Sequence, residues 1–158
     1  MCPALRRLTP ATGQLGVVHP RTDEVFGETL RTPSAYVVPG RLGELVFGAT
    51  MEFGRLDFEE DQPALDSLFA HVRRILPGVR FDGPPAPYAV AVRPMSADWG
   101  PLVGPSGPEG LMLAAGHGRY GWLLAPATAQ AISAYVFDDP VTPLWESFHP
   151  ARFEAKAA

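Results

Sequence analysis

Apolar residues between positions 61 and 78 recur at steps of three, four and seven, the spacing of one helical face. They are Leu65, Leu68, Phe69, Val72, Ile75 and Leu76. Pro63 is tolerated in a first turn, and Pro77 with Gly78 stops the helix. Acidic residues 59–61 place negative charge at its N-terminus. The pattern predicts a helix that begins at Asp61 and packs its apolar stripe into a core.

Short β-rich runs precede and follow this helix. Residues 14–18 predict a short strand, and residues 35–39 and 44–50 flank a glycine-containing turn, which predicts a hairpin. Residues 88–93 predict a strand that ends on Arg93. Residues 94–107 contain too many prolines and glycines for a regular element, so we expect a loop that lines something.

A strand at 111–115 is expected to give way, through a turn at 116–121, to an apolar helix over 121–136. Pro126 is tolerated only in the first turns of that helix. The tail from 142 carries three aromatic residues that we expect to pack back on the body. The order of elements predicts an α+β unit with a mixed β-sheet rather than a doubly wound sheet.

Composition narrows the function classes. The chain has 158 residues, 46% of them hydrophobic, which is enough for one globular core. A net charge of −4 with scattered basic residues argues against nucleic acid. Cys2 is the only cysteine, which excludes a disulfide or a cysteine-based zinc site, and the four histidines lack metal-ligand spacing. No run of membrane-spanning length or signal peptide is present, so we expect a cytoplasmic, soluble protein.

Three residues are candidates for chemistry. Arg93 at a strand end either pairs with an acid or holds an anionic carboxylate. Arg119 lies between glycines, where it either swings over a ligand or remains a solvated loop residue. His117 is a formal candidate base, but we favour packing with a backbone hydrogen bond and assign no catalytic residue. The glycine-rich turn itself can turn backbone N–H groups toward an electron-rich ligand.

Five motifs in order resemble the C-terminal half of FAD-dependent glycine/D-amino-acid oxidases, nearest to the glycine oxidases of thiamine biosynthesis. The motifs are YVVP (36–39), LVFGATM (45–51), RP (93–94) with PLVG (101–104), AGHGRYG (115–121) and LAPAT (124–128). The similarity runs from about Leu8 to Val136. Because five separate motifs keep the family's order, the resemblance is specific.

The resemblance implies roles for particular residues. Arg93 matches the arginine that holds the substrate carboxylate, Tyr36 and Met51 match pocket residues, and Arg119 matches a second arginine beside the flavin. The residues that would follow the flavin edge are His117, Gly118, Arg119, Tyr120, Gly121, Trp122 and Leu123. In such enzymes a hydride passes from the amino-acid α-carbon to flavin N5, the imine is hydrolysed, and O2 reoxidises the flavin.

The same resemblance implies an organisation. Residues 1–92 would form a substrate-binding domain, residues 93–140 its end and a flavin-contacting strand, turn and helix, and residues 141–158 a tail. Tyr120 stands where the family usually has Asn, Met95 with Ser96 where it usually has Gly and Thr or Ser, and Gly40 where Arg is frequent. These departures leave the substrate open.

No Gly-x-Gly-x-x-Gly stands early in a βαβ unit, where the dinucleotide fingerprint belongs, so we expect an incomplete FAD site that lacks an N-terminal Rossmann half. A truncated gene product, a split enzyme with a Rossmann-containing partner chain and an excerpt all fit. The expected function is therefore a partial amino-acid oxidoreductase that is inactive alone. The alternatives are a non-catalytic subunit that binds a partner or itself, and a small-acid binding module that uses Arg93 and Arg119 without flavin.

Overall fold

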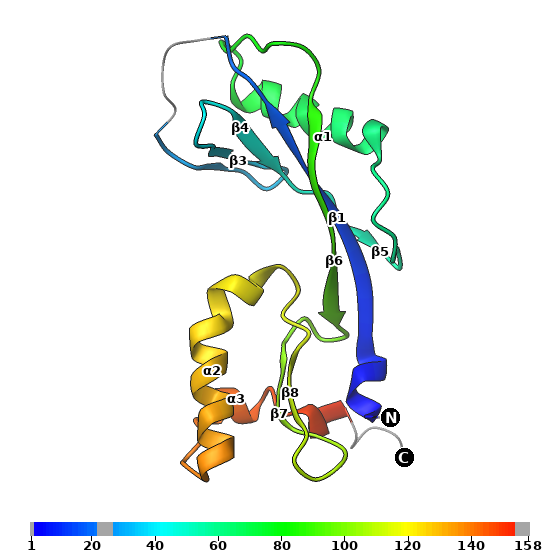
Figure 1. Cartoon of the computed structure of the whole chain (residues 1–158), viewed down its shortest axis with the longest axis vertical. Helices are drawn as coiled ribbons and strands as arrows, with labels where there is room; N and C mark the ends of the chain where they lie inside the picture. Colours follow the sequence, from blue (N-terminus) through cyan, green and yellow to red (C-terminus); the bar gives the residue numbers. More distant parts are fainter. Residues whose placement is uncertain (1, 22–26, 154–158) are drawn as a thin grey trace. The chain divides into compact units, whose positions relative to one another are not determined.

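A computed structural model describes residues 2–21 and 27–153, which form two compact units (Figure 1). The sheet unit comprises residues 12–92. The turn unit comprises the residues up to Ala11 together with those from Arg93 onward. Strands β1 and β6 contribute residues to both. The α+β class is confirmed, while the division into substrate-binding and flavin-contacting parts stays a prediction. The last residues of the predicted tail, 154–158, lie outside the described residues.

The sheet unit is built on one sheet with the strand order β2-β3-β4-β1-β5, with β6 also paired to β1. The strands are β1 (Leu8–Val18), β2 (Leu30–Arg31), β3 (Tyr36–Pro39), β4 (Leu45–Gly48), β5 (Glu52–Phe53) and β6 (Ala86–Ser96). The predicted hairpin is confirmed: β3 and β4 pair antiparallel, with Tyr36 opposite Gly48 and Pro39 opposite Leu45.

Helix α1 (Gln62–Ile75) forms where the apolar spacing predicts it. The side chain of Asp61 caps it, accepting a hydrogen bond of 2.9 Å from the backbone N–H of Ala64. The helix covers one face of the sheet (Figure 1). The core between them consists of Val18, Ala35, Val37, Leu45, Phe47, Leu65, Leu68, Val72 and Leu76. Burial of these side chains is the main force that holds the sheet unit together.

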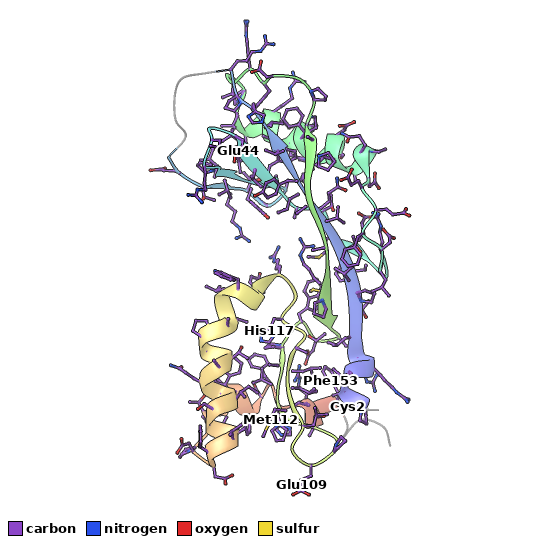
Figure 2. The ribbon with its side chains drawn as sticks, viewed as in Figure 1. Cys2, Glu44, Glu109, Met112, His117 and Phe153 are labelled. Atoms are coloured by element: carbon purple, nitrogen blue, oxygen red, sulfur yellow. The ribbon has the colours of Figure 1, made fainter. Side chains whose placement is uncertain are left out.

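The turn unit contains a two-stranded antiparallel sheet with Leu102 opposite Ala115. Its elements are η1 (Pro3–Arg7), β7 (Leu102–Pro105), β8 (Met112–Ala115), η2 (Gly118–Tyr120), α2 (Gly121–Phe137), α3 (Pro143–Glu146) and η3 (Pro150–Phe153). The tail packs back as expected. Phe153 lies against the small core around Cys2 (Figure 2), and Arg152 forms an ion pair of 2.8 Å with Asp98.

One sequence prediction about strands was wrong, and another gave a strand that was too short. The loop expected over 94–107 contains the end of β6 and all of β7, and the strand expected at 14–18 is the second half of the longer β1. Proline and glycine misled the prediction. Pro94 occupies an exposed position in β6, and strand ends and edges tolerate the missing N–H of a proline.

The N-cap of α1 is open to a direct test. Replacing Asp61 with Ala removes the acceptor for the Ala64 N–H, which we expect to lower the free energy of unfolding by about 1 kcal/mol. Urea denaturation followed by far-UV circular dichroism measures this. Glu60→Ala, an exposed acidic neighbour, is the control and leaves stability unchanged. Equal loss in both variants would show that bulk charge, rather than the cap, stabilises the helix.

Candidate functional site

The turn between β8 and α2 packs closely against the end of β6. His117 forms an antiparallel bridge with Met95, and Gly116 and Gly118 have φ of +74° and +54°. A Cβ at Gly118 would lie 2.5 Å from the sulfur of Met95. The positive φ favours glycine at both positions, and a side chain at 118 would also displace the end of Met95. Met95, which is buried, is a packing partner that the sequence gave no means to identify.

The ring of His117 is tied to helix α2. Its Nε2 lies 2.9 Å from the hydroxyl of Thr128, which is 6% exposed. Burial lowers the pKa of His117, so the imidazole stays neutral near pH 7. The sequence analysis favoured a packed His117 with a hydrogen bond to the backbone. The ring is packed, but its hydrogen-bond partner is the side chain of Thr128, eleven residues along the chain. A single threonine within the apolar stretch 122–129 was the available signal for Thr128.

Helix α2 begins directly after the turn of η2. Tyr120, at the capping position, makes no side-chain cap, and the first turn holds no acidic residue. The first backbone N–H groups of a helix have no partner within it and carry partial positive charge. Beside them, Trp122 and Leu123 expose large apolar side chains. This end of the helix can accept a ligand that is electron-rich at one edge and apolar elsewhere.

Two arginines belong to the turn unit. Arg119 is exposed, and its guanidinium donates to the hydroxyl of Tyr120 at 2.8 Å while lying 5.0 Å from the centre of that ring. Arg93 is half-buried on β6, two residues before Met95. Because side chains alternate along a strand, Arg93 shares a face of β6 with Met95. Tyr120, where the family usually has Asn, thus directly holds one of the two arginines.

Tyr36 and Met51 belong to the sheet unit. Tyr36 lies in a hollow of about 750 Å³ with mostly apolar walls, including Leu15, Val38 and Val46. At its rim Glu44 accepts a hydrogen bond of 2.8 Å from the N–H of Leu42, and such backbone donors lower the pKa of Glu44 (Figure 2). Met51, between β4 and β5, is not among the described residues that line the hollow. The substrate-binding roles of these residues and of both arginines stay predictions.

Residues 1–135 match the family described as FAD dependent oxidoreductase. The chain belongs to this family. Among relatives, it is 36% identical over 121 residues to the bifunctional protein ThiO/ThiG of Synechocystis sp., covering 77% of this chain and 18% of that protein. It is 35% identical over 130 residues to a glycine oxidase of Bacillus licheniformis, covering 80% of this chain and 35% of the relative.

Solved structures agree on the fold of the chain. A glycine oxidase from Geobacillus kaustophilus superposes with a TM-score of 0.75 at 24% identity, covering 92% of this chain and 40% of that one. An iminodiacetate oxidase from Chelativorans sp. superposes with a TM-score of 0.74 at 23% identity, covering 91% of this chain and 40% of that one. The chain thus spans about two fifths of these structures and about a third or less of the curated relatives named above.

The residues of the turn fit a flavin in their donor chemistry. The uncapped N–H groups of α2 suit an electron-rich edge, and the exposed Trp122 and Leu123 suit an aromatic ring system. No group of three His, Cys, Asp or Glu side chains placed to hold a metal occurs in residues 2–21 and 27–153. None of the helices described there is long and apolar enough to cross a membrane.

The burial of His117 predicts a pH dependence of stability. Its pKa is lowered in the folded chain, so just below the ordinary value of about 6.5 the unfolded chain binds more protons. The free energy of unfolding should therefore fall as pH drops through this range. Tryptophan fluorescence follows it in the turn unit, which holds all three tryptophans, Trp99, Trp122 and Trp145.

Two substitutions define the origin of this pH dependence. His117→Gln should abolish the slope, because no titrating ring remains at this site. His71→Gln, on α1 of the sheet unit, should leave it intact. A slope that survives His117→Gln would assign the titration to another group.

Proposed function

We propose that this chain is the amino-acid-binding and flavin-contacting part of an FAD-dependent amino-acid oxidase. The observation that carries the proposal is the turn at 116–121, which leads into an uncapped helix and bridges to the strand that bears Arg93. Membership of the FAD dependent oxidoreductase family and relatives named glycine oxidase support it. Glycine and small D-amino acids are the substrates we propose to test.

FAD, when bound, would supply the redox chemistry by taking a hydride from the substrate α-carbon. The chain's own residues would bind and orient. Arg93 carries a planar fork of donors whose geometry matches a carboxylate. Within the sheet unit, the apolar hollow beside Tyr36 is a surface suited to an apolar group. The positive end of α2 would favour negative charge beside it.

No side chain at the turn is assigned as a catalytic acid or base. The Nε2 of His117 is engaged by Thr128, and burial disfavours the charged ring. The guanidinium of Arg119 donates a hydrogen bond to the hydroxyl of Tyr120. These residues therefore act by position and charge, which agrees with a reaction whose electron acceptor is the cofactor.

Arg93 provides the sharpest test of substrate binding. The chain is mixed with FAD and a separately produced nucleotide-binding part of a glycine oxidase, and peroxide formation from glycine and D-alanine is measured. Arg93→Lys keeps the charge but loses the bidentate fork, and we expect kcat/KM to fall about 10- to 100-fold.

Arg73→Lys, at an exposed position on α1, is the matched control and should leave the rate unchanged. Equal rates for Arg93→Lys and wild type would remove Arg93 from the substrate site. No flavin retention and no peroxide from the wild-type mixture would overturn the oxidase proposal itself.

A second candidate function is association with a nucleotide-binding polypeptide or with another copy of this chain. Helix α2 contacts β7 and β8, yet exposes Trp122 (96%), Leu123, Val136 and Phe137 (73%) to solvent. Apolar side chains gathered on one exposed face favour association. This observation supports a binding role whether or not the assembled protein is an oxidase.

Light scattering tests this association. The wild-type chain should form oligomers, and replacing both Val136 and Phe137 with Asn should shift it toward the monomer. Leu56→Asn, which removes an apolar side chain that is 70% exposed in the sheet unit, is the control. A wild-type chain that is monomeric at high concentration would contradict the proposal.

A further inference from the structure

The hydroxyl of Thr128 is a polar group in an otherwise apolar stretch of α2. Thr128 is 6% exposed, and its Oγ1 lies 2.9 Å from His117 Nε2 (Figure 2 labels His117). Across the described residues, Oγ1 has no second hydrogen-bond partner. A threonine hydroxyl carries one proton, and a buried hydroxyl proton needs an acceptor.

This requirement selects the tautomer of His117. If Nε2 carried the ring proton, it would donate to Oγ1, and the hydroxyl proton would have to turn away from the contact, where no acceptor is present among the described residues. If Nε2 presents its lone pair, the hydroxyl donates to it and both groups are satisfied. The ring proton then resides on Nδ1.

The other ring nitrogen is accessible. Nδ1 has no hydrogen-bond partner within residues 2–21 and 27–153, and it is not among the enclosed polar atoms that lack one. The neighbouring groups of the turn and helix are also donors: the first N–H groups of α2 and the guanidinium of Arg119. An Nδ1–H group continues this donor surface, whereas a lone pair would interrupt it.

We infer that Thr128 is a positioning residue that fixes His117 as the Nδ1–H tautomer, so that the ring presents a hydrogen-bond donor at the turn. That the ligand served by this donor is a flavin rests on the proposed function. The tautomer itself rests only on the contact between the two side chains.

Long-range proton–nitrogen NMR of the full chain with labelled histidine tests the inference. The His117 signals are assigned by their loss in His117→Gln. In the wild type we expect the proton on Nδ1. Thr128→Val, which keeps the shape and removes the hydroxyl, should give a mixture of tautomers, and Thr128→Ser should restore the wild-type pattern.

Thr142→Val makes the same substitution at an exposed threonine and should leave the His117 signals unchanged. A wild-type proton on Nε2 would overturn the inference. So would a Thr128→Val chain that keeps Nδ1–H, because the tautomer would then be set by another group. A purely structural role for Thr128 would not produce rescue of the tautomer by serine.

An FAD titration of the same samples, followed by the flavin absorption spectrum, reports separately on the proposed function. An unperturbed spectrum in the presence of the nucleotide-binding part would count against flavin binding. The tautomer result requires no cofactor, so it would still test the role of Thr128.

Discussion

The close packing of the turn at 116–121 is the constraint on which the candidate site depends. Gly118 lies against the end of the Met95 side chain, so a side chain at position 118 would require Met95 to move. The contact between His117 and Thr128 ties the same turn to α2. Strand β6 and helix α2 thus hold the turn from two sides. The donors of the turn are therefore oriented before any ligand binds.

The two units supply different chemistry. The turn unit contributes donors and positive charge through the N-terminus of α2, Arg93 and Arg119. The sheet unit contributes an apolar hollow around Tyr36, whose rim carboxylate, on Glu44, is already engaged by backbone N–H groups.

The sequence could predict what depends on local spacing. The hairpin, α1 and its cap, and the strand and helix around the turn all follow from periodicity, turn residues and capping chemistry. It failed over 94–107, where Pro94 and several glycines resembled a loop although the chain forms β6 and β7. The role of Met95 comes from a contact between segments distant in sequence, which no local pattern encodes. The role of Thr128 comes from the orientation of one side chain on α2, eleven residues from His117. The candidate site residues came from the family motifs rather than from periodicity.

The most direct test of the account is amide chemical-shift mapping of the labelled chain on addition of FAD with a nucleotide-binding part. The account predicts the largest FAD-dependent shifts at residues 117–123, where the turn enters α2, relative to the same mixture without FAD. Shifts confined to other segments, or none at these residues when FAD is bound, would contradict the claim that this turn contacts the flavin.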